Sequence, residues 1–294
     1  MTRTAPFLAA LAIAATFAPL TAQHGALPER DSFLAEARKR LASNELLQSR
    51  YSYRERVTEV RFNPFGAIGT GPIEVFEVYP VVPGQLTYRR LVERGGTAVP
   101  ESELRTADRQ FLARYYQWQR DLAREGQDER QARLKREAAE REKDRARAAE
   151  AVGLFHFTLE RRDYLEGQPV ILVRFAPKPN VQPRSREGRV AASFAGTAWV
   201  HEHEHEVMRV EAEAIDDTVF GYGVIARLHQ GAKALFIRRK FGDAWLPVET
   251  RVTGTGRAML FRKVNINYLR EYSDYRPFDA ATFMQRLGVA TGNN

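Results

Sequence analysis

The stretch GTAWVHEHEHEVMRVE, residues 196–211, decides the fold class of this chain. Apolar and polar residues alternate on both sides of the charged run, from Gly196 to Val200 and again from Val207 to Glu211. A period of two is typical of a half-buried strand, and two such segments joined by a short polar run predict an antiparallel hairpin. The HEHEHE run is then the turn of that hairpin.

The alternating pattern continues through most of the chain. Strands are expected at 51–62, 73–79, 85–93, 153–162, 169–176, 190–200, 206–215, 232–241, 245–254 and 258–270. Apolar spacing predicts an opening helix over 31–48. Successive strands without helices between them form antiparallel sheets, so the sequence predicts an α+β fold. About ten strands would form one strongly curved sheet, with the few helices covering one of its faces.

Residues 101–150 are predicted to be helical. The first half carries apolar residues at steps of three, four and seven, which predicts a helix packed on the body of the protein: Leu104, Ala107, Phe111, Tyr115, Trp118 and Leu122. The second half, 126–150, has eight basic and seven acidic residues, and Leu134 is its one bulky apolar residue. We therefore expect a helical insertion with an exposed charged arm over 126–150, within a single domain spanning 23–294.

The N-terminus has the layout of a secretory signal peptide. Arg3 provides a positive charge, an apolar run follows from Phe7 to Leu20, and Ala22 is a small residue at the predicted cleavage site. The run is too short and too rich in alanine for a good membrane span. Residues 1–22 are therefore predicted to be a cleavable signal peptide, and the protein to be periplasmic or secreted.

The chain has a formal net charge of +8 and no cysteine. The absence of cysteine excludes disulfides, a thiol nucleophile and a thiolate metal site. Basic residues are concentrated late in the sequence, over 227–270, and they predict a positive sheet edge that would meet an anionic membrane surface. Nucleic acid is not expected as a partner, because an exported chain has little access to it.

The HEHEHE run allows two metal hypotheses. His201, Glu202 and His205 match the H-E-x-x-H pattern of zinc peptidases, but that chemistry needs a helix and the flanking segments are strands. On an extended segment His201, His203 and His205 would share one side and could hold zinc or copper. The alternative is a solvated turn. No other catalytic or cofactor motif is found, so neither an enzyme nor a cofactor is predicted.

The apolar residues of the predicted strands form a broad hydrophobic surface. They are expected either to be the core between sheet and helix or to line a groove for an acyl chain. The candidate ligand-binding residues are Phe155, Phe157, Ile171, Val173, Trp199, Val210, Phe236, Trp245 and Phe261.

Three segments carry a family resemblance. Gly196 to Val200, a polar turn and Val207 to Glu211 resemble the paired strands of the periplasmic LolA/LolB/RseB-like superfamily, in which a Trp-(Ile/Val)-Asp strand end precedes an Arg-x-Glu strand. Here His201 stands in place of the usual Asp. Residues 245–247 and 272–278 resemble the closing strands of exported members of this outer-membrane lipoprotein carrier-like group.

The resemblance implies a half-barrel of about eleven antiparallel strands with helices on the concave face. It also implies binding of a lipid or an acylated protein in the apolar concave face, as a carrier or sensor. Two alternatives stay open: a structural or regulatory scaffold that binds a partner protein through 101–150, and a metal-binding protein that uses the HEHEHE turn.

Overall fold

A computed structural model describes residues 26–58, 60–62, 68–220, 226–258 and 262–290. The predicted signal peptide, residues 1–22, and the candidate residue Phe261 lie outside the described residues. Among the described helices, none is both long and apolar enough to cross a membrane.

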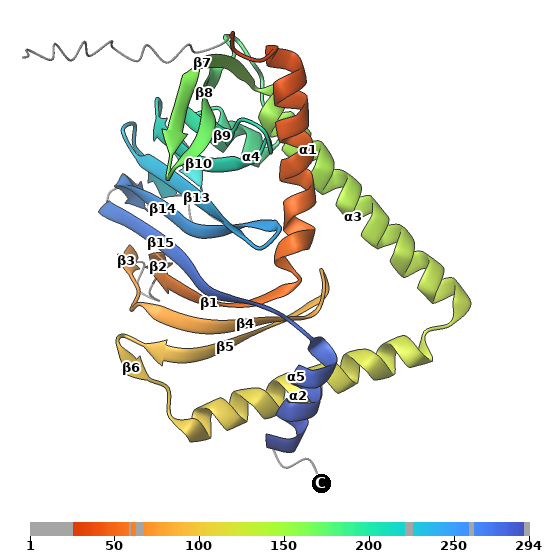
Figure 1. Ribbon diagram of the computed structural model, residues 1–294. Coiled ribbons are helices and arrows are strands. Elements are labelled where there is room, and N and C mark those ends of the chain that lie inside the picture. The colour runs from red at the N-terminus through yellow and green to blue at the C-terminus, as the bar shows by residue number, and fades with distance from the viewer. Residues whose placement is uncertain (1–25, 59, 63–67, 221–225, 259–261, 291–294) are drawn as a thin grey trace, which may run out of the picture.

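The protein is built around one large antiparallel sheet (Figure 1). Its strands follow the order β6-β5-β4-β1-β15-β14-β13-β10-β9-β8-β7, with β11 and β12 attached to β14, while β2 and β3 form a separate pair. The strands are β1 Tyr51–Thr58, β2 Val60–Phe62, β3 Ile68–Thr70, β4 Glu74–Val82, β5 Leu86–Arg94, β6 Thr97–Ala98, β7 Phe155–Leu165, β8 Gln168–Pro177, β9 Phe194–His201, β10 Val207–Ala214, β11 Thr218–Phe220, β12 Ala226–Leu228, β13 Lys233–Phe241, β14 Ala244–Ala258 and β15 Arg262–Pro277. The predicted α+β fold with one curved antiparallel sheet is confirmed.

Five helices accompany the sheet in the described part of the chain. They are α1 Arg30–Gln48, α2 Glu101–Arg124, α3 Gln127–Gly153, α4 Arg186–Ala191 and α5 Ala280–Ala290. The opening helix begins where the Glu29 carboxylate accepts hydrogen bonds from the backbone N–H groups of Asp31 and Ser32, at 2.9 and 2.7 Å. Such a cap satisfies backbone donors that have no partner inside the helix.

Helix α1 runs along the concave face of the sheet from β8, β9 and β10 to β14 (Figure 1). Its Phe33, Leu34 and Ala37 are buried against Ile171 and Val200, which are 0% and 3% exposed. Alternation along β8 and β9 sends these strand residues to one face, where an apolar helix face can cover them. This half of the concave face is therefore filled by the chain itself.

Helices α2 and α5 lie on the other side of β4 and β5. Phe111 and Leu112 of α2 are buried against Tyr88, and the ring of Phe283 in α5 stacks on Tyr79 with centroids 4.2 Å apart. Tyr79 and Tyr88 form a cross-strand pair next to the pair of Val78 with Arg89, so the two pairs project to opposite faces. The cross-strand pairs can be followed from β4 through β1, β15, β14 and β13 to β10. They place Val78 on the same face of the sheet as the residues that α1 covers.

Helices α2 and α3 connect the two edges of the sheet, because α2 follows β6 and α3 leads into β7. The expected single helical insertion is two helices, with a bend at Glu125 and Gly126. Most described side chains of α3 are exposed. Its end is attached to the body, since the Glu150 carboxylate accepts hydrogen bonds from the backbone N–H groups of Arg184 and Ser185.

Candidate functional site

The structure divides the predicted ligand-binding residues between the two faces of the sheet. Six of them share the concave face: Phe155, Phe157, Ile171, Val173, Val210 and Phe236. Ile171 and Val173 are 0% and 2% exposed, packed beneath α1. These two are core residues, and the other four are half-buried at the margins of the same cluster or on neighbouring strands.

Trp199 and Trp245 lie on the opposite face. They pack with Val170, Leu172 and Met208, and Val170 and Leu172 alternate along β8 with the residues that face α1. The Arg209 guanidinium lies 5.6 Å from the centre of the Trp199 ring. Trp199 and Trp245 thus lie apart from the other candidate residues, because hydrophobicity alone does not determine to which face of a sheet a residue points.

The half of the concave face beyond α1 carries a group of tyrosines. The ring of Tyr53 on β1 lies 5.8 Å from Tyr272 and 5.3 Å from Tyr275, both on β15, and Tyr275 lies 5.0 Å from Phe241. Tyr272 and Tyr275 can share a face because β15 holds one extra residue there, with Asp274 at a φ of 56°. A bulge of this kind re-aims the side chains that follow it.

Beside the tyrosines, two arginines converge on one buried carboxylate. Glu55 on β1 is 3% exposed. Its oxygens lie 2.6 Å from Arg89 Nη2 and 3.0 Å from Arg270 Nε, and the two arginine side chains are 40% and 29% exposed. The Arg89 guanidinium also stacks over the Phe76 ring at 4.1 Å. We call Tyr53, Glu55, Phe76, Arg89, Arg270, Tyr272 and Tyr275 the tyrosine–arginine surface.

The charge of this surface is carried by its two arginines and one glutamate. Burial raises the pKa of Tyr53 to about 12, and the nearby Glu55 carboxylate adds to the effect. Burial likewise raises the pKa values of Tyr272 and Tyr275, so all three phenols are neutral near pH 7. Two cations against one anion leave one net positive charge beside aromatic rings. The arrangement suits a ligand with an anionic group and an apolar body.

Sequence reasoning missed the tyrosine–arginine surface, although a signal was present. Tyr53 and Glu55 alternate on one strand, and Tyr268, Arg270 and Tyr272 alternate on another. Each run predicts one polar, aromatic strand face. The pairing of β1 with β15, which brings the two faces together, is not contained in either run.

The HEHEHE segment is the turn between β9 and β10, as predicted. His201 is 5% exposed, and its Nδ1 accepts hydrogen bonds from the backbone N–H groups of His203 and Glu204, at 3.2 and 3.1 Å. His205 has a φ of 58° and packs its ring on Phe33, with centroids 5.1 Å apart. The segment is not extended: the rings of His201 and His203 lie 6.1 Å apart, whereas the ring of His205 packs on Phe33 instead.

The glutamates of the turn are used in ion pairs. Glu202 pairs with Arg162 at 2.7 Å, Glu204 with Lys240 at 2.6 Å, and Glu206 with Arg238 at 3.1 Å. Among the residues that the structure describes, no group of three His, Cys, Asp or Glu side chains is placed to hold a metal ion. The turn thus fastens β9–β10 to its neighbouring strands.

Stability is expected to depend on the protonation of His201. Burial lowers the pKa of His201 below its ordinary value of 6.5, which means that the folded state favours the neutral ring. The stability from this neutral ring is fully present above pH 6.5 and is lost as the pH falls through 6.5 toward the folded pKa. Urea unfolding of the protein and of a His201→Gln variant over this range would measure the loss, which the variant should not show. A His156→Gln variant, in which an exposed histidine is replaced, should lose stability over this pH range as the wild type does.

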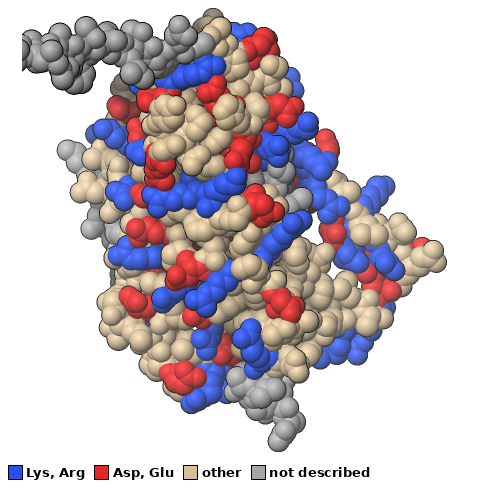
Figure 2. All heavy atoms as spheres, viewed as in Figure 1, with Lys and Arg blue, Asp and Glu red and all other residues tan. Residues whose placement is uncertain are grey.

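The basic residues of 227–270 do not form a sheet edge. Strands β13, β14 and β15 lie in the middle of the sheet order, between β10 and β1. Arg239 pairs with Glu166 at 2.7 Å, and Lys240 and Arg270 also pair with glutamates of other segments. Figure 2 shows Lys and Arg interspersed with Asp and Glu over the visible face. The predicted positive edge is wrong, because a charge count along the sequence does not place the strands.

Comparison with known proteins gives remote structural likenesses. No family model matches the chain, and no curated protein matches it. A DUF1329 family protein from Desulfovibrio piger is similar with 10% identity and a TM-score of 0.29, over 85% of this chain and 96% of that chain. MucB in complex with MucA(peri) is similar with 8% identity and a TM-score of 0.23, over 83% and 99% of the two chains.

A third similar structure is the MucA/MucB complex of Pseudomonas aeruginosa, with 7% identity and a TM-score of 0.22, over 83% of this chain and 99% of that chain. At these identities and TM-scores the three structures carry no argument about the family or the function of this chain.

Proposed function

We propose that this chain is an exported envelope protein that binds a lipid or an acylated protein on its concave face, as a carrier or sensor. The observation that carries the proposal is the convergence of Arg89 and Arg270 on the buried Glu55, beside the rings of Tyr53 and Tyr272. Export is supported by the order of charge, apolar run and small residue within 1–22.

The ligand is assigned to the tyrosine–arginine surface because α1 already covers the apolar residues of β8, β9 and β10 on this face. The apolar residues beneath α1 are core, whereas the tyrosines and both arginines are half-buried or exposed. An acyl chain would lie on the aromatic rings, and its carboxylate or phosphate would face the arginines. Hydrogen bonds from arginine to such groups are charge-assisted and can be bidentate.

An Arg89→Ala substitution is expected to weaken binding of a fluorescent fatty acid, such as cis-parinaric acid, by about ten- to a hundredfold. That range corresponds to about 1.5–3 kcal/mol for a hydrogen bond to a charged group. Glu55 would keep Arg270 as a partner in this variant, so the fold should persist. Fluorescence titration of the purified protein measures the dissociation constant.

Arg56→Ala is the matched control. Arg56 follows Glu55 on the same strand but projects to the opposite face, where it pairs with Glu271. Its loss should leave fatty acid binding unchanged. Equal weakening by the two substitutions, or a fatty alcohol that binds as tightly as the fatty acid, would contradict the proposal. Native mass spectrometry of protein purified from the periplasm would identify the natural ligand.

A further inference from the structure

Helix α2 extends beyond the sheet that it packs against. Phe111 and Leu112 are 0% and 2% exposed beside Tyr88. The apolar stripe then continues through Tyr115, Trp118 and Leu122, which are only half-buried. Figure 1 shows the corner between α2 and α3 as the part of the described chain that lies far from the strands. The stripe is therefore longer than the core that it covers.

Aromatic side chains are grouped on α2 toward this corner, and Tyr115 among them still packs against the core. The ring of Tyr115 lies 5.6 Å from Tyr116 and 6.0 Å from Trp118. Tyr116 is 38% exposed, and Leu134, on the next helix, is 41% exposed. We call Tyr115, Tyr116, Trp118, Leu122 and Leu134 the elbow surface. Large apolar side chains grouped in this way on an exposed helix indicate an interaction surface.

The bend that carries the elbow surface is held by ion pairs. Arg133 contacts both oxygens of Glu125, at 2.8 and 2.9 Å, and also reaches Glu137 at 3.0 Å. The Glu129 carboxylate accepts a hydrogen bond from the backbone N–H of Gly126 at 3.0 Å. These contacts join the bend to the N-terminal turns of α3.

The charges around the elbow surface favour an anionic partner. Residues 114–136 hold seven Arg or Lys against four Asp or Glu. Trp and Tyr prefer the boundary between lipid and water, and flanking basic side chains are attracted to anionic headgroups. A helical protein partner would need an apolar seam, and α3 is charged on all sides with few apolar residues. Bilayer chemistry fits these residues better than a protein groove does.

We propose that the elbow surface docks the protein on the anionic phospholipid surface of a membrane, with Trp118 and Tyr116 at the headgroup level. The proposal does not rest on the proposed ligand of the concave face. The membrane contact is then made at the corner between α2 and α3, and not by the basic residues of 227–270 on the central strands.

The test uses the purified full chain and vesicles of phosphatidylcholine, with and without phosphatidylglycerol. Wild-type protein should sediment with the phosphatidylglycerol vesicles, more weakly at high salt, and poorly with phosphatidylcholine alone. A Trp118→Ser/Leu134→Ser variant should bind the anionic vesicles at least about tenfold more weakly, because it loses apolar contact area. Circular dichroism should show an unchanged fold, since these residues lie outside the buried core.

A second readout identifies the contacting residue. Lipids brominated on their acyl chains quench only tryptophans that reach the bilayer, so quenching should be present in the wild type and absent in Trp118→Phe. Tyr164→Ser is the control, because Tyr164 is 74% exposed on the β7–β8 hairpin, away from α2 and α3. Its vesicle binding should equal that of the wild type.

Three results would overturn the proposal. They are equal sedimentation with neutral and anionic vesicles, equal loss of binding in the Tyr164→Ser control, and quenching that persists in Trp118→Phe. Dimerisation of the wild type that disappears in the Trp118→Ser/Leu134→Ser variant, without vesicle binding, would instead assign the elbow surface to a second copy of this chain.

Discussion

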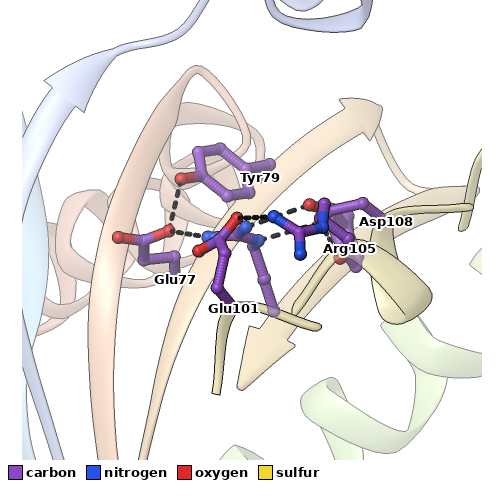
Figure 3. Close-up of polar contacts among 7 residues, drawn as sticks. Glu77, Tyr79, Glu101, Arg105 and Asp108 are labelled. Carbon is purple, nitrogen blue, oxygen red and sulfur yellow. Dashed lines mark hydrogen bonds and ion pairs between the residues drawn. The ribbon is translucent and has the colours of Figure 1, made fainter. Parts of the chain in front are cut away.

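Replacing Asp108 by alanine is expected to lower the free energy of unfolding by about 3–5 kcal/mol, the usual cost of removing one partner of a buried ion pair. Asp108 on α2 is 3% exposed. It accepts two hydrogen bonds from Arg90, at 2.8 and 2.9 Å, and one from the Tyr88 hydroxyl at 2.5 Å. Figure 3 shows Asp108 beside Glu77 and Tyr79 of β4, where α2 meets the sheet.

The loss follows from the groups left behind. Arg90 would keep its longer contact with Glu77, at 3.6 Å, and the Tyr88 hydroxyl beneath Phe111 would lose the carboxylate that accepts its hydrogen bond. Burial and the hydrogen bond to Asp108 together raise the pKa of Tyr88. Urea unfolding monitored by circular dichroism measures the change.

Asp121→Ala on the same helix is the control for this experiment. Asp121 is exposed and accepts a hydrogen bond from Gln117, so its loss should cost less than about 0.5 kcal/mol. If Asp108→Ala unfolded at the same urea concentration as Asp121→Ala, the contact of α2 with β5 would not depend on this ion pair.

Replacing Glu206 by alanine is expected to destabilise the protein by a similar amount, about 3–5 kcal/mol. Glu206 and Arg238 are 6% and 4% exposed, with Oε2 and Nη1 3.1 Å apart. Burial already lowers the pKa of Arg238 against the opposing effect of Glu206. Without the carboxylate, Arg238 would keep its hydrogen bond to the Trp245 carbonyl but hold a buried charge with no counter-ion at this position.

Two variants separate the charge effect from a general loss of packing. Glu213→Ala changes an exposed residue of β10, the strand that begins directly after Glu206, and should cost less than about 1 kcal/mol. A Glu206→Leu/Arg238→Met double variant should be more stable than Glu206→Ala, because it removes both charges together. If the double variant were less stable than Glu206→Ala, the ion pair itself would stabilise the hairpin, and the unpaired charge of Arg238 would not explain the loss. Thermal unfolding measures all three.

Periodicity along the chain predicted most of the regular structure. Each strand expected from alternation corresponds to an observed strand, and the opening helix expected over 31–48 is α1, Arg30–Gln48. The short elements β3, β6, β11, β12 and α4 were not predicted, because two to six residues are too few to show a period. Helix α5 was also missed, although Asp279 marks its start by accepting a hydrogen bond from the backbone N–H of Ala281.

The candidate site was less predictable than the fold. Alternation separates two sets of residues on each strand, but it does not tell which set lies on the concave face. The bulge at Asp274 changes the alternation within β15 and brings Tyr275 to the side of Tyr272. Similarly, Met208 is the extra residue of a bulge between Val207 and Arg209, and its side chain packs with Trp245 on the outer face. Neither bulge is marked by a Gly or Pro that sequence reasoning could have used.

The sequence by itself determined the strands, the opening helix, the hairpin of residues 196–211 and the amphipathic stripe of α2, because these depend on neighbours two to seven positions apart. Only the tertiary structure decided that β1 pairs with β15, so that Glu55 meets Arg270. It also decided that α1 fills half of the concave face and that α2 ends beyond the sheet. These contacts join residues far apart in the chain, and their register depends on the packing of the whole sheet rather than on any local pattern.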